Sequence, residues 1–446
     1  MSDAQHNLRR GLDFCSVAAD RLFAARISWY WSVVFLFVFC LNAYGQEPWT
    51  WEKVKERFQT NNPTLLADKL SIDESKAQEI TAFLRPNPTF TLSVDGTQIA
   101  PDHSGFWRPL AGTFESPSIS YLHERQRKRE LRLESARNGT LIAESSHADV
   151  ERTLLFNLRG AFVSALQAKA VLQLAKDNLV YYDHVLEISR TRYSAGDIAQ
   201  IDLDRLELQR VQYESDLQAA VENLEAAKIQ LLTLLNSRTP VDEFDVTGPF
   251  DFSDQLMPRD EFRKIALDTR PDLKAAVEAV DKAQTDHKLA VANGSTDPTL
   301  SAWYTHNSST NNPHGINTVG LSVSIPLRIF DRNQGEKLRT QLDITRNERL
   351  RDAAEAAVLS DVDSSYATVD SNLVLLRPYK AKYLQQSVRV RDTISFSYQH
   401  GGTALLDFLN AQAEYRSVQL NYVNLVGSYL TAAAQLNLAV GREAIP

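Results

Sequence analysis

A tyrosine, a glycine and an aspartate recur in the same order at two places in the chain. The first copy holds Tyr193, Gly196 and Asp202, and the second, 205 positions later, holds Tyr398, Gly401 and Asp407. A carboxylate attracts cations, and a tyrosine hydroxyl can donate a hydrogen bond to a carboxylate. Glycine tolerates the positive φ angles that tight backbone reversals need. The repeated residues therefore indicate electrostatic and hydrogen-bonding roles at two similar turns.

Residues that could support catalysis or bind a cofactor are not grouped in this sequence. It contains no phosphate-binding glycine loop and no H-E-x-x-H zinc motif. The nine histidines are scattered, and we expect His103, His306 and His314 to be solvated residues in or near loops rather than metal ligands. The sequence therefore predicts a protein that is not an enzyme and that needs no metal or cofactor.

The N-terminus predicts export from the cytoplasm. Arg21 and Arg26 precede the apolar run "ISWYWSVVFLFVFCLNAYG", whose end carries small residues suited to signal-peptidase cleavage. We interpret residues 1–45 as a signal peptide, and a membrane anchor is the alternative reading. Both cysteines, Cys15 and Cys40, lie within this segment, so no disulfide is expected in the mature chain. The net charge of -8 gives no support for nucleic-acid binding.

Long helices dominate the predicted structure. Apolar residues recur at alternating spacings of three and four, which is typical of coiled-coil packing. The four long helices are expected at about 123–192, 199–236, 333–396 and 404–440. Pro378 lies inside the third of them, where we expect a kink or a break. The 205-residue offset indicates two structural repeats, at 46–240 and 241–446.

Short alternating segments precede each pair of long helices. The predicted strands are at about 89–95 and 113–122 in the first repeat and 299–305 and 317–327 in the second. One face of these strands is apolar and the other polar, as in an outer-membrane barrel, although a small soluble sheet is the alternative. Four strands cannot close a membrane barrel, and open edges are not tolerated in lipid. Three chains would supply twelve strands.

With this order of elements, the sequence resembles the TolC family of outer-membrane efflux channels. The resemblance covers nearly all of the mature chain. It rests on "RYSAGDIAQIDLDRLELQRVQYE" and "SYQHGGTALLDFLNAQAEYRSVQ", and on the pre-strand segments "NNPTLLADKLSIDESKAQEI" and "TRPDLKAAVEAVDKAQTDHKLA". It implies a mainly α-helical fold with some β-structure, assembled as a homotrimer. A twelve-stranded barrel in the outer membrane would continue into a twelve-helix α-barrel that extends through the periplasm.

The resemblance also implies roles for individual residues. Gly196 and Gly401 would mark two helix-turn-helix tips on which a periplasmic adaptor protein docks. Asp407 and Asn410 would line the narrow entrance, where the family often has a second acid in place of Asn410. A contact between Tyr398 and Asp202 would help to hold that entrance shut. A basic residue common in this latch is replaced here by Thr403. The alternative is that these residues only pack the turns.

One segment resembles a particular branch of the family. "SIPLRIFDRNQGE" is similar to the channels of cobalt-zinc-cadmium resistance pumps, although the segment could simply shape the barrel-to-helix junction. The implied function is passive conduction from an inner-membrane pump, expected to be of the resistance-nodulation-division type, through the adaptor to the exterior. An outlet for type I protein secretion and a structural coiled-coil envelope protein without a channel remain alternatives.

Overall fold

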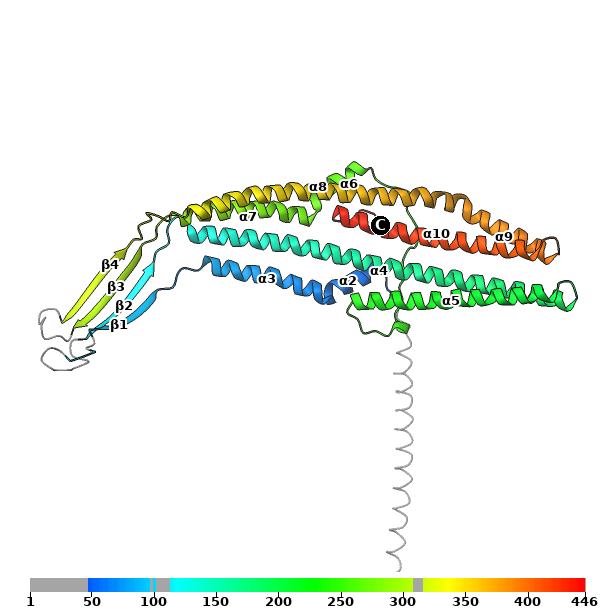
Figure 1. Ribbon diagram of the computed structural model, residues 1–446, viewed down its shortest axis with the longest axis horizontal. Helices are drawn as coiled ribbons and strands as arrows, with labels where there is room; N and C mark the ends of the chain where they lie inside the picture. Colours follow the sequence, from blue (N-terminus) through cyan, green and yellow to red (C-terminus); the bar gives the residue numbers. More distant parts are fainter. Residues whose placement is uncertain (1–46, 97–98, 102–112, 308–315, 446) are drawn as a thin grey trace, which may run out of the picture.

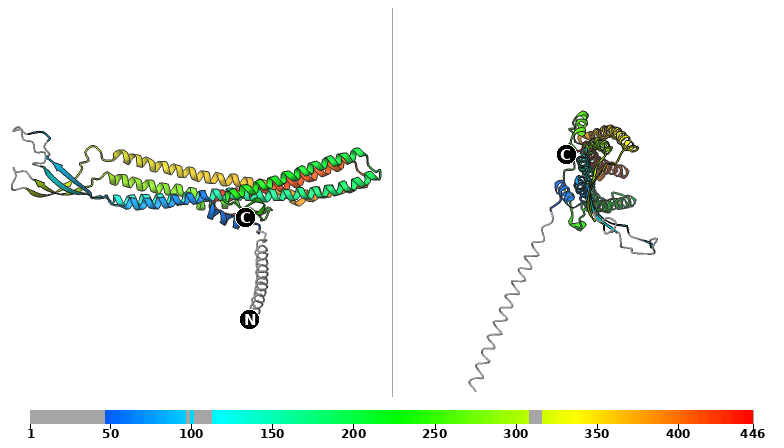
Figure 2. Two further views of the ribbon diagram at one scale, coloured as in Figure 1. Left: turned by 90° about the horizontal axis from the view of Figure 1, so that it is seen from below. Right: turned by 90° about the vertical axis from the view of Figure 1, so that its left-hand side faces the viewer.

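The computed structural model describes residues 47–96, 99–101, 113–307 and 316–445. The interpretation of residues 1–45 as a signal peptide lies outside these residues, as do His103 and His314. The molecule is elongated, with a small sheet at one end and two helical hairpin turns at the other (Figure 1). Both views in Figure 2 show that the helices form one gently curved layer.

Four long helical segments run along the molecule. They are α4 (Lys128–Ser194), α5 (Gln200–Leu234), α8 (Gln334–Pro378) continued by α9 (Leu384–Gln399), and α10 (Leu405–Val440). At 1.5 Å per residue, the 67 residues of α4 span about 100 Å. The expected interruption at Pro378 is present, because α8 ends there and a π-helical turn, Tyr379–Tyr383, separates it from α9.

The first long helix begins at Lys128 rather than at about residue 123. Gln126 and Arg127 have φ angles of 59° and 54°, in the left-handed region that an α-helix does not use. Residues 123–127 therefore form a separate link between the sheet and the helix. A similar link precedes α8, where Asn333 has φ 60°.

The sequence interpretation missed four shorter helices that precede the strands. They are α2 (Trp51–Asn61), α3 (Pro63–Phe83), α6 (Arg259–Thr269) and α7 (Pro271–Asn293). Their start signals are visible in the sequence, because Pro63 and Pro271 each occupy the first turn of a helix. The side chain of Asn62 also caps α3 by accepting a hydrogen bond from the backbone N–H of Leu65.

The sheet has four antiparallel strands in the order β1-β2-β3-β4. Their bounds are Thr89–Asp95, Phe114–Leu122, Thr299–Asn307 and Asn317–Ser324. The last strand is three residues shorter than expected, since Pro326 has no backbone N–H for a further ladder bond. Pairing of β2 with β3 joins the two halves of the chain. In the part of the chain that the structure describes, β1 and β4 have no further strand on their outer sides.

The two faces of the sheet differ sharply in chemistry. One face carries apolar side chains such as Phe90, Ile119 and Leu321, which the strand register aligns in one row. The opposite face carries mostly hydroxyl groups, namely those of Thr89, Thr91, Ser93, Ser116, Ser118, Ser120, Thr299, Ser301, Thr305, Thr318, Ser322 and Ser324. Phe114, Leu122 and Trp303 are the large apolar exceptions, and Asp95 is a charged one. The indole of Trp303 covers Gly320, where a Cβ atom would lie 2.3 Å from the ring.

Near the sheet, the helices follow the order α3-α4-α7-α8, so that α3 and α8 form the two edges of the layer (Figure 1). Further along, α5, α4, α10 and α9 pack in that order toward the hairpin turns. Buried apolar residues form three clusters along this layer, and the third lies beside the hairpin turns. Among the helices that the structure describes, none is both long and apolar enough to span a membrane.

Candidate functional site

The two helical hairpins end in turns with the same hydrogen-bond pattern. Gly196 has φ 81° and Gly401 has φ 75°. The N–H of each glycine donates to the carbonyl three residues earlier, at 2.9 and 3.1 Å. The next N–H donates to the carbonyl five residues earlier, at 2.9 and 2.8 Å. This is the Schellman arrangement that ends a helix at a left-handed glycine, and both glycines therefore have a conformational role.

The repeated tyrosines occupy different environments, even though their turns match. Tyr193 is exposed, whereas Tyr398 is only 5% exposed. The ring of Tyr398 stacks on that of Phe408, with centroids 4.8 Å apart. The sequence repeat thus predicted the matching turn backbones, but it did not predict that Tyr398 is buried and Tyr193 exposed.

Asp202 and Asp407 each occupy the third residue of a helix, α5 and α10 respectively. A carboxylate in the first turn is favoured by the positive end of the helix dipole, which gives both residues a structural role. Asp407 and Asn410 are also exposed, while Phe408 between them is buried. The two polar side chains therefore share a free face of α10, three residues apart.

The expected hydrogen bond between Tyr398 and Asp202 is not formed within the described part of the chain. The Tyr398 hydroxyl is buried there without a hydrogen-bond partner. Burial raises the pKa of Tyr398, and the nearby Asp202 carboxylate adds to that rise. The two groups are thus close enough to interact electrostatically, although Asp202 accepts no bond from this hydroxyl.

Arg192 makes the contact between the hairpins that the sequence interpretation assigned to Tyr398 and Asp202. Its guanidinium donates to the backbone carbonyl of Tyr398 at 2.7 Å and lies 5.4 Å from the centre of that ring. Arg192 stands in the last turn of α4, where a basic residue suits the helix dipole. A basic residue in the last turn of a predicted helix was therefore a sequence signal that could have identified Arg192. Thr403, by contrast, bonds to Ser397 within its own hairpin.

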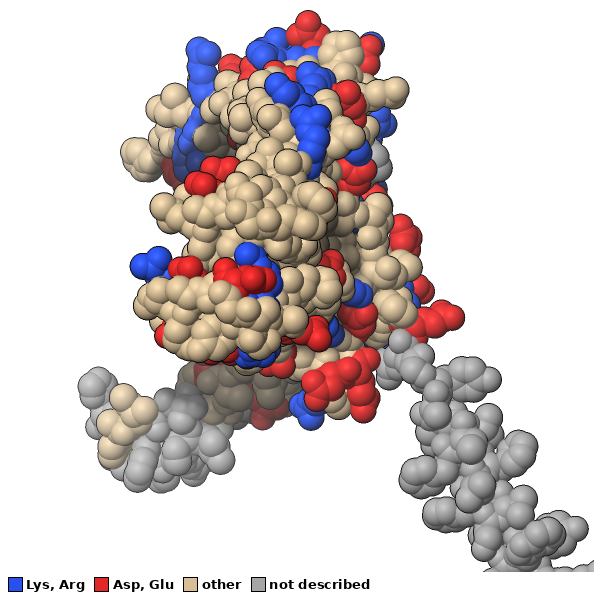
Figure 3. Space-filling view, turned by 90° about the vertical axis from the view of Figure 1, so that its right-hand side faces the viewer, with Lys and Arg blue, Asp and Glu red and all other residues tan. Residues whose placement is uncertain are grey.

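An open groove of about 900 Å³ lies further along the hairpins, between α4, α5 and α10. Its lining is made mainly of alanines and of uncharged polar side chains, including Gln167, Asn223 and Asn424. The two hairpins therefore do not pack tightly over their whole length. They meet again at the tips, where uncharged side chains cover most of the surface facing the viewer in Figure 3.

Metal-binding chemistry finds no support among the described residues. No three histidines, cysteines or acidic residues there are grouped so that they could hold a metal ion. His306 is the next-to-last residue of β3, and its Nδ1 atom is 2.9 Å from the side-chain oxygen of Asn317.

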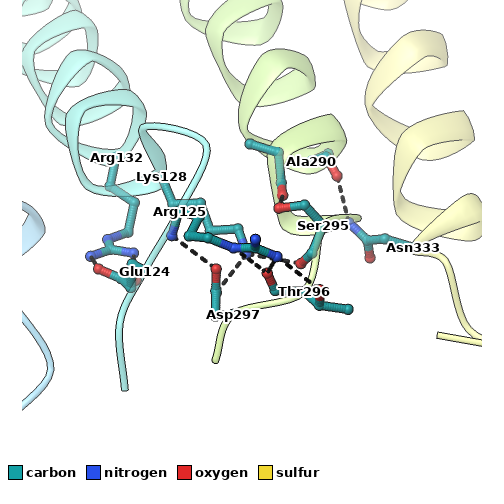
Figure 4. A network of polar contacts seen from close by, with 10 residues as sticks. Glu124, Arg125, Lys128, Arg132, Ala290, Ser295, Thr296, Asp297 and Asn333 are labelled. Atoms are coloured by element: carbon teal, nitrogen blue, oxygen red, sulfur yellow. Dashed lines mark hydrogen bonds and ion pairs between the residues drawn. The ribbon is translucent and has the colours of Figure 1, made fainter. Parts of the chain in front are cut away.

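A polar network joins the sheet to the helices (Figure 4). Lys128 is 4% exposed, and its ammonium donates to Asp297 at 2.6 Å and to the carbonyl of Ser295 at 3.0 Å. Arg125 binds the same segment through the backbone and side chain of Thr296. The link after β2 is thereby fastened to the link before β3.

The fold and the paired hairpins define an elongated helical protein with a small antiparallel sheet at one end. A family model described as outer membrane efflux protein matches residues 56–237 and 263–442. The chain therefore belongs to the outer membrane efflux protein family.

Named relatives agree with this assignment. The cobalt-zinc-cadmium resistance protein CzcC of Cupriavidus metallidurans is 22% identical over 403 residues, which span 89% of this chain and 90% of that protein. The pyoverdine export outer membrane protein OpmQ of Pseudomonas aeruginosa is 25% identical over 355 residues, 78% of this chain and 72% of OpmQ. The names of these relatives refer to resistance and to export.

Solved structures share the fold at low sequence identity. CusC, whose structures are described as revealing transmembrane channel formation, gives a TM-score of 0.74 at 17% identity over 88% of this chain and 92% of that chain. The outer membrane channel MtrE of Neisseria gonorrhoeae, in its open state, gives 0.71 at 18% identity, over 88% of this chain and 89% of MtrE.

Proposed function

We propose that this protein is the trimeric outer-membrane channel of a tripartite efflux system. The observation that carries the proposal is the pair of free sheet edges, β1 and β4, on opposite sides of one protomer. An open edge leaves backbone N–H and C=O groups without partners, which lipid does not tolerate. Pairing β4 of one protomer with β1 of the next would close a twelve-stranded barrel from three copies.

The helical layer has matching free edges. Exposed apolar residues on α3 include Leu66, Leu70 and Ile80, and those on α8 include Leu338 and Leu342. A head-to-tail contact between these two edges would bury them and close a ring of helices beneath the barrel. The free edges of the sheet and those of the helical layer thus favour the same association.

The two faces of the sheet fit such a barrel. Its apolar face, with Leu321 and Val323 exposed in one protomer, would contact lipid. Its hydroxyl-rich face would line a water-filled pore. Since the lining carries mainly serine and threonine, with Asp95 as a charged side chain on the same face, we expect the barrel itself to conduct solutes passively.

At the other end of the molecule we propose the gate and the adaptor surface. Asp407 and Asn410 would face the axis on α10, supported by their exposure in one protomer. Tyr398 and Asp202 would hold the closed state, assisted by Arg192. The turns at Gly196 and Gly401 would dock a periplasmic adaptor, which connects the channel to an inner-membrane pump of the resistance-nodulation-division type.

Metal ions and small molecules are the proposed cargo. CzcC, which is similar over most of both chains, is named for cobalt-zinc-cadmium resistance, and OpmQ is named for pyoverdine export. The pump rather than the channel would select among such substrates.

Purified protein in planar lipid bilayers should test the channel proposal. We expect discrete conductance steps that multivalent cations block from the side of the hairpin tips. Failure of folded, membrane-extracted protein to conduct under any voltage would contradict the proposal.

Substitution of the tip glycines should weaken adaptor binding while leaving assembly intact. Valine at residue 196 or 401 would adopt a positive φ, at a cost of about 1–2 kcal/mol, although no neighbouring atom opposes its Cβ closely. We expect cross-linking to the adaptor to fall in Gly196→Val and Gly401→Val. Gly335→Val is the control, because that glycine also has open space but no positive φ. Equal cross-linking in all three variants would place the adaptor surface elsewhere.

A further inference from the structure

Unpaired arginines lie in three of the four links between the sheet and the helices. Arg85 lies between α3 and β1, Arg127 between β2 and α4, and Arg328 and Arg332 between β4 and α8. Within the described residues, none of these four guanidinium groups forms an ion pair. They therefore form a belt of positive charge at the root of the sheet, which we call the arginine belt.

Two nearby acidic groups are already paired with basic side chains, and a third, Asp331, keeps its charge. The Glu124 carboxylate accepts hydrogen bonds from two guanidinium nitrogens of Arg132, and Asp297 is paired with Lys128. The carboxylate of Asp331 accepts the backbone N–H of Asn333 at 2.8 Å, which stabilises the turn before α8. The chain itself thus leaves the arginine belt without a full set of counter-charges.

Large apolar side chains are exposed at the same level. Phe330 is 90% exposed, and Leu327 and Ile329 beside it are also exposed, as is Leu84 on the link after α3. They continue the exposed apolar row of β4, which includes Leu321. Basic residues that flank exposed apolar groups are typical of surfaces at a membrane–water boundary.

The length of the sheet sets the depth of this boundary. Strands of seven to nine residues are about 23–31 Å long, and at the usual tilt of barrel strands they cover about 18–24 Å of an apolar band that is about 25 Å tall. When the sheet spans the hydrocarbon, the links lie at the headgroups of the periplasmic leaflet. Closure of the ring would also place Arg85 of one protomer beside Arg328 and Arg332 of the next. An anion between them would offset the repulsion of these like charges.

We propose that the arginine belt binds the phosphate groups of anionic phospholipids in the periplasmic leaflet, while Leu327, Ile329 and Phe330 insert among the acyl chains. This inference rests on the proposed membrane-inserted trimer. Lipid phosphate is the proposed partner of the arginine belt, because a second protomer would add positive charge beside the belt rather than neutralise it.

The test is retention of phosphatidylglycerol by purified trimer, measured by native mass spectrometry in detergent doped with that lipid. Each arginine contributes about a fivefold change in affinity near an anionic surface. We expect Arg332→Gln to weaken phosphatidylglycerol binding about fivefold and Arg85→Gln/Arg127→Gln/Arg328→Gln/Arg332→Gln to abolish it. Binding of zwitterionic phosphatidylcholine should be equal in all variants. Arg349 is an exposed arginine on α8 away from the links, so Arg349→Gln is the matched control. This variant should bind phosphatidylglycerol as strongly as the unsubstituted protein does.

Unchanged phosphatidylglycerol binding in the quadruple variant would overturn the inference, as would an equal loss in Arg349→Gln. Full displacement of the lipid by inorganic phosphate would show a free-phosphate site instead and would also overturn it. If the quadruple variant does not assemble, Arg332→Gln decides the question alone. A trimer that conducts normally but shows no arginine-dependent binding would remove this inference and leave the channel proposal intact.

Discussion

Replacing Lys128 with methionine is expected to lower the free energy of unfolding by about 3 kcal/mol. The substitution removes the buried ammonium and leaves the Asp297 carboxylate, 15% exposed, without its 2.6 Å partner. The carbonyl of Ser295 loses a donor as well. Urea denaturation in detergent measures this change. Because the network joins the links of β2 and β3, we expect the loss to appear in barrel assembly as well.

Lys76→Met is the matched control for this prediction. Lys76 and Glu144 are 4.0 Å apart and both about half exposed. Loss of this ion pair in Lys76→Met should therefore change the unfolding free energy by less than about 1 kcal/mol. Combining Lys128→Met with Asp297→Asn should cost less than Lys128→Met alone, since the orphaned charge is removed. Equal effects of Lys128→Met and Lys76→Met would show that the junction pair does not stabilise the protein.

The same ion pair predicts a pH dependence. Burial alone would raise the pKa of Asp297, but hydrogen bonds from Lys128 and from the backbone of Arg125 outweigh it and hold the pKa below its usual 3.8. A lowered folded-state pKa adds stability above the unfolded value. That contribution is lost as the pH falls below about 3.8 and through the folded pKa. In Lys128→Met, the free energy of unfolding should therefore fall less steeply as the pH drops below about 3.8.

Replacing Asp407 with alanine is expected to raise the half-blocking concentration of a multivalent cation at least about tenfold. In the proposed trimer, three Asp407 carboxylates converge on the axis, and their combined attraction for a cation is lost together. Asn410→Asp should have the opposite effect, because it adds a second ring of carboxylates one helical turn away. Planar-bilayer recordings at graded cation concentrations measure both changes.

Asp204→Ala serves as the control for the gate. Asp204 is an exposed aspartate near the start of α5, and its carboxylate accepts a hydrogen bond from Gln200 within the same helix. Its removal changes the net charge equally but should leave the block unchanged. If Asp204→Ala and Asp407→Ala alter the block to the same extent, general surface charge rather than a gate ring sets cation affinity.

Much of the architecture could be predicted from local patterns. Alternation of apolar and polar residues located β1 to within a residue, and three-four periodicity located α10 equally well. Both patterns arise because one face of the strand or helix is buried, and this does not depend on which distant segment covers that face. The turn glycines were predictable for a similar reason, since the left-handed conformation at Gly196 and Gly401 is a property of the backbone alone.

Contacts between distant segments could not be predicted in the same way. Lys128 and Asp297 are 169 residues apart, and nothing local to either residue identifies its partner. The Tyr398–Asp202 contact was transferred from a resemblance, but the stacking of Tyr398 on Phe408 buries its hydroxyl away from a partner in the isolated chain. Arg192 was overlooked because its role depends on the packing of one hairpin against the other.

Association of three copies through their free edges is central to the proposed channel. Native mass spectrometry of the protein extracted from outer membranes tests this claim in one measurement. We predict a single species with three times the mass of the mature chain. A monomer, or a protein recovered only in the soluble fraction, would contradict the account, because one four-stranded sheet cannot close a channel.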